Sequence, residues 1–160
     1  MRIEIIVSFL LCCIGYINAI TPVSKCPQAR SPEEYKQVIT VGNCKKHPCR
    51  LRKGHTINVD FRFTPIAETK TVRNSVTATI AGLPFPFIGV DDTDACNNIF
   101  ESDGTTQAKC PLQSGKEYVY KNHFDILPLY PIVKVEVSWA LIGSDRQPVM
   151  CFTVPAKITN

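Results

Sequence analysis

The sequence predicts an all-β protein, an antiparallel β-sandwich of about seven to eight strands. Several segments alternate apolar and polar residues with a period of two, the pattern of a strand with one buried and one solvated face. No long stretch has the period of an amphipathic helix, and turn residues separate the alternating segments. Six cysteines beyond an apolar leader add the disulfide framework typical of a small extracellular domain.

Residues 1–19 are predicted to be a signal peptide. Arg2 places a positive charge near the start, residues 5–17 are mostly apolar, and Ala19 is a small residue suited to cleavage. The apolar run is shorter than the roughly 20 residues that a membrane-spanning helix needs. We therefore expect residues 20–160 to form one soluble, extracellular domain with its own core.

The cysteine count depends on this processing step, because Cys12 and Cys13 leave with the leader. An even number remains, and in an oxidising compartment that indicates disulfides in place of thiol chemistry. Six cysteines can pair in fifteen ways, so their spacing leaves the connectivity open. The remaining cysteines are Cys26, Cys44, Cys49, Cys96, Cys110 and Cys151.

Strand signals recur along the rest of the chain. The clearest segments are 55–64, 71–81, 117–127 and 132–142, and weaker ones are 35–41, 83–88 and 149–158. Each clear segment presents one apolar face, which is expected to be buried. The predicted apolar faces hold Ile57, Val59, Phe61 and Phe63; Val72, Val76, Ala78 and Ile80; Tyr118, Tyr120, Phe124 and Ile126; and Val133, Val135, Val137, Trp139 and Leu141.

Two proline-containing segments are expected at an edge or a rim, because proline cannot donate to a central ladder. Segment 83–87 carries Phe85 and Phe87 among its prolines, and segment 123–131 is also rich in apolar residues. These side chains either line an opening or pack as a plain hydrophobic edge, and the sequence leaves both readings open. The stretch 89–109 is expected to be irregular.

The net charge of +4 is mild and does not indicate a nucleic-acid partner. Basic residues nevertheless cluster in one region, which is either a solvated strand edge or a docking patch for an anionic membrane or a partner. The cluster comprises Lys45, Lys46, Arg50, Arg52 and Lys53. No Asn-x-Ser/Thr acceptor occurs, so neither N-glycosylation nor sorting by an N-glycan is expected.

No motif in the chain predicts catalysis. It has no G-x-S-x-G elbow, no phosphate-binding glycine loop and no H-E-x-x-H, and the neighbours of His47, His55 and His123 do not indicate activation. Residues 44–49 lack the second cysteine pair of a zinc site. The acidic stretch 91–94 lacks the glycine and terminal glutamate of a calcium loop. We therefore expect no enzyme activity, no cofactor and no metal.

A series of motifs runs in order along nearly all of residues 20–160. They are Cys44-x4-Cys49 with Leu-Arg-Lys-Gly at 51–54, Gly-Leu-Pro-Phe-Pro-Phe at 82–87, Cys-Pro-Leu at 110–112, Tyr118 and Tyr120, Tyr130-Pro131, and the Val-Glu-Val-Ser-Trp run ending at Trp139. Together they resemble the Niemann–Pick type C2 proteins of the lipid-recognition (ML) family, which also includes the group 2 mite allergens. The resemblance implies an immunoglobulin-like β-sandwich that encloses an apolar cavity for a lipid.

The resemblance also implies particular pairs and contacts. Its disulfides are Cys26–Cys151, Cys44–Cys49 and Cys96–Cys110. Its ligand contacts fall on Phe87, Ile126, Tyr130 and Pro131 at the mouth, with Trp139 and Phe152 deeper. Together with apolar positions on the predicted strands, the expected lipid-binding set is Phe61, Ile80, Phe85, Phe87, Tyr118, Phe124, Ile126, Tyr130, Pro131, Val137, Trp139 and Phe152.

The function expected from these observations is that of a secreted, extracellular, monomeric carrier of small hydrophobic ligands such as fatty acids or semiochemicals. Two departures favour the arthropod-type members of the family: the Cys96–Cys110 segment is long for a vertebrate sterol carrier, and no glycan acceptor is present. The alternatives are a sterol-binding protein that transfers its ligand between membranes, and a lipid-sensing interaction module. A transient contact with a membrane surface or a receptor is a further expected partner.

Overall fold

The structure is a computed structural model of the 160-residue chain, and it describes residues 20–26 and 39–160. The predicted leader, 1–19, and most of the weak strand segment 35–41 lie outside the described residues. Within the described ranges, no helix is both long enough and apolar enough to cross a membrane.

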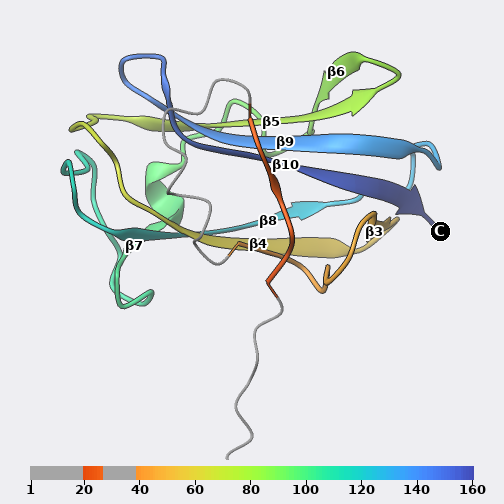
Figure 1. The fold of residues 1–160 in the computed structure, drawn as a ribbon, viewed down its shortest axis with the longest axis horizontal. Helices are drawn as coiled ribbons and strands as arrows, with labels where there is room; N and C mark the ends of the chain where they lie inside the picture. The colour runs from red at the N-terminus through yellow and green to blue at the C-terminus, as the bar shows by residue number, and fades with distance from the viewer. Residues whose placement is uncertain (1–19, 27–38) are drawn as a thin grey trace, which may run out of the picture.

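Two β-sheets face each other as the layers of a sandwich (Figure 1). The six-stranded sheet has the order β1-β10-β9-β5-β6, with β3 also paired to β10, and the four-stranded sheet has the order β2-β4-β8-β7. The first sheet contains β1 (Ser24–Lys25), β3 (Cys49–Arg52), β5 (Val72–Ile80), β6 (Leu83–Pro86), β9 (Lys134–Gly143) and β10 (Pro148–Thr159). The second contains β2 (Thr40–Val41), β4 (Thr56–Phe63), β7 (Ile99–Glu101) and β8 (Tyr118–Asp125), and a short 3-10 helix, η2 (Cys96–Asn98), precedes β7.

The predicted all-β sandwich is confirmed, but it contains more strands than expected. The additional strands include β1 and β7, which are only two and three residues long, too short for a period of two to stand out. The stretch 89–109, expected to be irregular, contains both η2 and β7. One pair is parallel, because β3 runs beside β10 with Cys49 opposite Ala156. The sandwich is therefore not antiparallel throughout.

The alternation within the long strands builds the core between the layers. In the β4–β8 ladder Phe61 lies opposite Tyr120, and in the β5–β9 ladder Val76 lies opposite Trp139. Residues directly opposite in an antiparallel ladder project to the same face. All four side chains are at most 1% exposed, so the predicted apolar faces of these strands are the buried ones.

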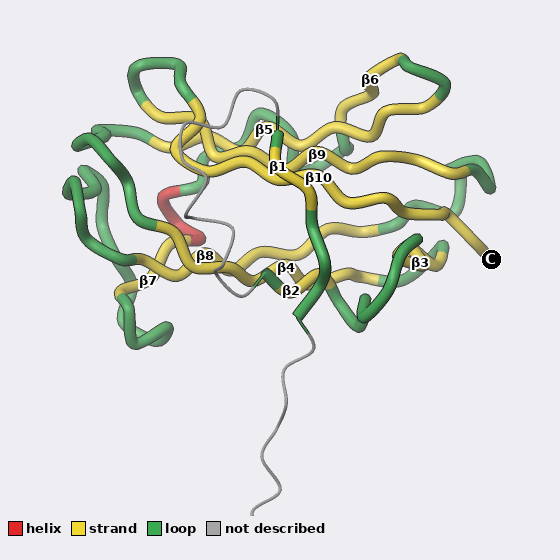
Figure 2. The backbone as a smooth tube through the Cα atoms, viewed as in Figure 1, coloured by secondary structure: helices red, strands yellow, loops and turns green. Residues whose placement is uncertain are grey.

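Consecutive strands β3 and β4 belong to different sheets. The turn between them contains Gly54 at φ 73°, in the left-handed region that glycine adopts without steric cost. Hydrogen bonds hold the turn to both sheets: Gly54 N donates to the Ile126 oxygen at 2.6 Å, and Lys53 N donates to the Thr159 oxygen at 2.9 Å. Figure 2 shows β3 near one end of the sandwich, close to the C-terminus.

Every cysteine beyond the predicted leader is in a disulfide, and the pairing is the one that the family resemblance implied. The disulfide that closes the longest loop joins the residue after β1 to β10, with a sequence separation of 125 residues. The shortest spans 5 residues at the start of β3, and the third spans 14 residues around η2 and β7. The pairs are Cys26–Cys151, Cys44–Cys49 and Cys96–Cys110.

We predict that the disulfide closing the longer loop stabilises the fold more, with the logarithm of the loop length. The double substitution Cys26→Ser with Cys151→Ser should lower the free energy of unfolding by about 5 kcal/mol, because a long loop restricts the unfolded chain most. The matched change Cys44→Ser with Cys49→Ser should cost about 2 kcal/mol. Urea unfolding measures both, and an equal loss in the two variants would contradict the loop-entropy account.

Candidate functional site

Aromatic side chains from both sheets meet between the layers. Phe61 of β4 stacks on Tyr120 of β8 with ring centroids 4.7 Å apart, and it meets Phe152 of β10 edge-on at 5.5 Å. Phe124 of β8 lies 5.7 Å from Trp139 of β9. The predicted ligand-contact residues of the two sheets therefore form one aromatic cluster in the interior.

The expected lipid-binding residues do not all have the same surroundings. Eight are buried: Phe61, Phe87, Tyr118, Phe124, Ile126, Val137, Trp139 and Phe152. Ile80 and Tyr130 are half-buried, and Pro131 is exposed. Phe85 is 48% exposed although it lies opposite the inward-facing Ala78, because β6 is the edge strand of its sheet.

The two proline-containing segments meet at one end of the sandwich. The ring of Phe87 lies 5.1 Å from that of Phe124 and 6.0 Å from that of Tyr130. Phe87 N donates to the Val76 oxygen at 2.9 Å, so the chain stays tied to β5 beyond the end of β6. Five of the seven exposed large hydrophobic residues in the described part of the chain lie in these two segments or directly beside them, namely Leu83, Phe85, Ile88, Leu129 and Ile132.

Within the part of the chain that the structure describes, two buried polar atoms of this aromatic cluster have no hydrogen-bond partner. One is the hydroxyl oxygen of Tyr130, and the other is Nε1 of Trp139. A buried polar group without a partner costs about 1–3 kcal/mol. The Tyr130 hydroxyl can therefore form a hydrogen bond with a new partner without losing an existing one. The Tyr120 hydroxyl, in contrast, already has two hydrogen-bond partners.

A hydrogen-bonded bridge joins the two sheets inside the cluster. The Tyr120 hydroxyl of β8 donates to Asn74 Oδ1 of β5 at 2.5 Å and accepts from Asn122 Nδ2 at 2.7 Å. Asn74 Nδ2 in turn donates to the Thr93 hydroxyl at 2.9 Å. Burial raises the pKa of Tyr120 far above its ordinary value, and its hydrogen bonds with Asn122 and Asn74 and the neighbouring indole of Trp139 only partly oppose this rise.

The sequence analysis missed Asn74, which is 2% exposed. It occupies the inward position between Val72 and Val76 on β5, so a polar residue interrupts an otherwise apolar face. That interruption is the signal that could have identified it, because a buried amide needs hydrogen-bond partners.

The acidic stretch 91–94 stabilises its own loop. Asp91 Oδ1 accepts from Val76 N at 2.7 Å, Asp92 Oδ1 accepts from Arg73 Nε at 2.8 Å, and Asp94 Oδ1 accepts from Cys96 N at 2.9 Å. Across the described ranges 20–26 and 39–160, no three His, Cys, Asp or Glu side chains gather as they would around a metal ion.

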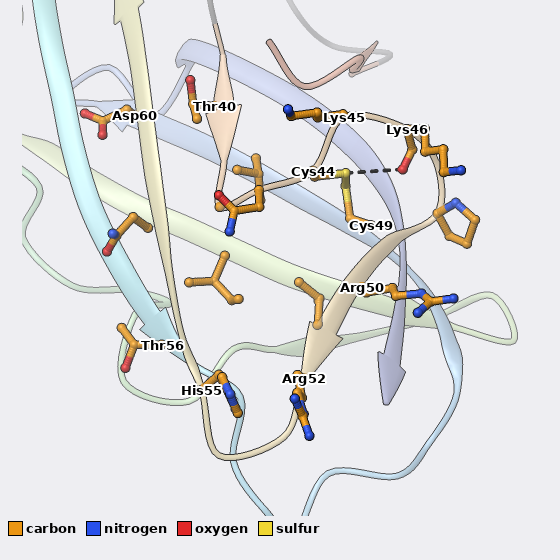
Figure 3. A pocket seen from close by; sticks show the side chains of 17 residues that line it. Thr40, Cys44, Lys45, Lys46, Cys49, Arg50, Arg52, His55, Thr56 and Asp60 are labelled. Atoms are coloured by element: carbon orange, nitrogen blue, oxygen red, sulfur yellow. Dashed lines mark hydrogen bonds between the residues drawn. A yellow bond between two sulfur atoms is a disulfide. The ribbon is translucent and has the colours of Figure 1, made fainter. Parts of the chain in front are cut away.

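A separate hollow of about 840 Å³ lies between β3 and the β2–β4 side of the sandwich (Figure 3). None of the expected lipid-binding residues lines it, whereas four of the five clustered basic residues do. We call it the β3–β4 hollow. It is lined by Thr40, Val41, Gly42, Asn43, Cys44, Lys45, Lys46, Pro48, Cys49, Arg50, Leu51, Arg52, His55, Thr56, Ile57, Asn58 and Asp60.

We predict that Tyr120→Phe lowers the free energy of unfolding by about 1–3 kcal/mol, because Asn74 and Asn122 each lose a buried partner. The raised pKa of Tyr120 adds a pH signature. Its stabilising contribution is complete below about pH 10, the ordinary tyrosine value, and is lost as the pH rises further. The gap between wild type and variant in urea unfolding should therefore narrow above about pH 10. A gap that stays constant with pH would contradict this assignment.

Comparisons with known proteins agree with this geometry. The model of the ML domain family matches residues 21–158. The "NPC intracellular cholesterol transporter 2" of Canis lupus familiaris is 30% identical over 123 residues, covering 75% of this chain and 74% of the relative. The "Mite group 2 allergen Der p 2" of Dermatophagoides pteronyssinus is 27% identical over 128 residues, covering 79% of this chain and 81% of the allergen.

A solved structure gives the same result at the level of the fold. The crystal structure of a Niemann-Pick type C2 protein from the Japanese carpenter ant superposes with a TM-score of 0.64 at 25% identity. The superposition covers 76% of this chain and 89% of the ant protein. With a family model that spans almost all described residues, the chain belongs to the ML-domain family.

Proposed function

We propose that this protein is a secreted, extracellular carrier that binds a small hydrophobic ligand, such as a fatty acid or a semiochemical, between its two sheets. Membership of the ML-domain family supports this proposal, and so do relatives named as cholesterol transporters. The interior supports it as well, because aromatic side chains of both sheets meet there. The proposed carrier is a monomer, contacts a membrane or a receptor only transiently, and has no enzyme activity.

The observation that carries the proposal is the unpaired hydroxyl of Tyr130. It is buried at the end of the aromatic cluster, beside Phe87 and next to the exposed apolar segments. A tyrosine in this position combines an apolar ring with one polar tip. The carboxylate or hydroxyl of a bound lipid would supply the missing partner while its chain lies against Phe87 and Phe124.

Burial of the ligand chain would supply the main favourable contribution to the binding free energy. A chain that buries ~10 methylenes gains about 8 kcal/mol, at ~0.8 kcal/mol for each methylene. Association and ordering of the chain reduce this gain. Micromolar binding, about −8 kcal/mol, therefore requires a longer buried chain or additional polar contacts, such as one to Tyr130, but no ion pair.

A sterol is the second candidate ligand. The observation that favours it is the name of the mammalian relatives, which are intracellular cholesterol transporters. A sterol also joins one hydroxyl to a large apolar body, and this suits a single polar contact at Tyr130. Binding of either ligand is consistent with the same site, so the natural ligand must be identified directly.

We predict that the protein purified from its native tissue carries a chain-like lipid. Mass spectrometry of an organic extract, compared with an extract of the protein after delipidation, measures this. A recovered fatty acid or other chain-like lipid is the expected result. A recovered sterol would favour the second candidate, and the absence of any lipid would contradict the carrier function.

We predict that Tyr130→Phe separates binding from stability. The substitution removes a hydroxyl that has no partner in the protein, so the free energy of unfolding should stay the same or rise. Binding of a long-chain fatty acid should weaken by about 0.5–1.5 kcal/mol, the value of one hydrogen bond. Displacement of a fluorescent lipid probe and urea unfolding measure the two quantities. Unchanged affinity would remove Tyr130 from the site.

Phe87→Asp is the stronger companion variant. It places a charge beside Phe124 and Tyr130, where desolvation costs several kcal/mol, so fatty-acid binding should be abolished. Because Phe87 is buried, circular dichroism must verify that the variant folds. Ile66→Asp is the matched control, since Ile66 is 59% exposed and lies outside the expected lipid-binding set. A folded Phe87→Asp protein with wild-type affinity would place the ligand elsewhere.

A further inference from the structure

The β3–β4 hollow opens where the two sheets separate at one edge. Its walls come from β3 of the six-stranded sheet and from β2 and β4 of the four-stranded sheet. In Figure 3, Lys45 lies at the end beside the Cys44–Cys49 disulfide, whereas Arg52 and His55 lie together at the opposite end. Cationic groups therefore stand at both ends of the hollow.

Its charge is strongly one-sided. The lining contains Lys45, Lys46, Arg50 and Arg52, against a single carboxyl group, that of Asp60. Burial raises the pKa of Asp60, and the nearby charge of Lys121 only partly opposes this rise. The ion pairs seen in the described part of the chain involve none of the four cations.

Part of the wall is apolar. Val41 and Leu51 belong to the buried core, and the half-buried Ile57 packs against it. A volume of about 840 Å³ falls within the range of roughly 300–1,000 Å³ that small-molecule sites occupy. The hollow thus combines an apolar wall with a basic rim, which is the complement of an anionic amphiphile.

We propose that the β3–β4 hollow is a second ligand site, for one single-chain amphiphile whose head is a phosphate monoester. The phosphate meets the rim cations, and the chain lies along Val41, Leu51 and Ile57. This site is separate from the aromatic cluster and goes beyond the proposed carrier function, because none of the residues proposed for that function lines it.

A phosphate monoester fits this rim better than a zwitterionic head. It carries about −1.5 to −2 charges near neutral pH and three strong acceptor oxygens. The guanidinium of Arg52 can bind two of these oxygens at once, and a lysine ammonium adds a point charge. A choline phosphate head would bring a positive group against the same cations. A flat bilayer surface would leave the concave apolar wall empty.

The experiment compares two lysophospholipids that share one acyl chain and differ only in the head. Isothermal titration calorimetry is performed below the aggregation concentration with lysophosphatidic acid and with lysophosphatidylcholine. We expect the phosphate monoester to bind at least about tenfold more tightly, as charge-assisted hydrogen bonds are worth about that factor. The difference should shrink as salt rises, because exposed charges are screened.

Variants locate the head within the hollow. Arg52→Gln and Lys45→Gln remove the cations at its two ends, and at least one of them should weaken binding of lysophosphatidic acid about tenfold. Lys53→Gln is the matched control, because Lys53 belongs to the same turn and the same charge cluster but does not line the hollow. The control should bind like the wild type, and all three substitutions fall on residues that are not buried.

Further measurements distinguish binding in the β3–β4 hollow from binding in the sandwich interior and from adsorption to a membrane. Tyr130→Phe and a folded Phe87→Asp should retain binding of lysophosphatidic acid, even where they lose fatty acid. Equal affinity for the two lysolipids, or wild-type affinity in both Arg52→Gln and Lys45→Gln, would overturn the proposal. Loss of lysophosphatidic acid binding in a folded Phe87→Asp protein would also overturn the proposal. Binding only to vesicles that contain phosphatidic acid would assign the cations to a membrane surface instead.

Discussion

The change of sheet between β3 and β4 is the constraint on which the rest of the structure depends. β3 adds in parallel to β10, while β4, only three residues later, pairs with β8 in the opposite layer. Backbone hydrogen bonds from the Gly54 turn to both Ile126 and Thr159 fix that crossing. The sheets are consequently held together at this end by covalent connection, and the space beside the crossing becomes the β3–β4 hollow.

Inside the sandwich, hydrogen bonding distinguishes two tyrosine hydroxyls, one with a structural role and one that is the proposed ligand contact. Tyr120 is paired on both sides, by Asn74 of one sheet and Asn122 of its own, so its hydroxyl ties the layers together. Tyr130 has an equally polar tip, no partner, and a place at the end of the aromatic cluster. A buried hydroxyl without a hydrogen-bond partner lowers the stability of the protein. A ligand that forms a hydrogen bond with this hydroxyl therefore removes that cost and gains binding free energy.

The long strands could be predicted from the sequence because their alternation spans many residues. The 55–64 and 132–142 segments correspond closely to β4 and β9, since a one-residue shift would turn Phe61 or Trp139 outward. β1 and β7 carry no such pattern and owe their pairing to β10 and β8. The basic cluster was visible in the sequence, but the hollow beside it was not. A hollow arises from β3 and β4 joining different sheets, and local residue patterns do not encode that choice.

The positions of the disulfides bear on where the proposed ligand would enter between the sheets. Cys26–Cys151 links β10 of the six-stranded sheet to the segment just after β1, and Cys96–Cys110 closes the η2–β7 region. Cys44–Cys49 joins the loop after β2 to β3, beside the hollow. The described residues around Phe87 and Tyr130 contain no disulfide. The layers are joined there by the backbone that runs from β8 to β9 and by ring contacts. Packing of this kind can yield to an apolar ligand that replaces the same contacts, whereas a covalent link cannot.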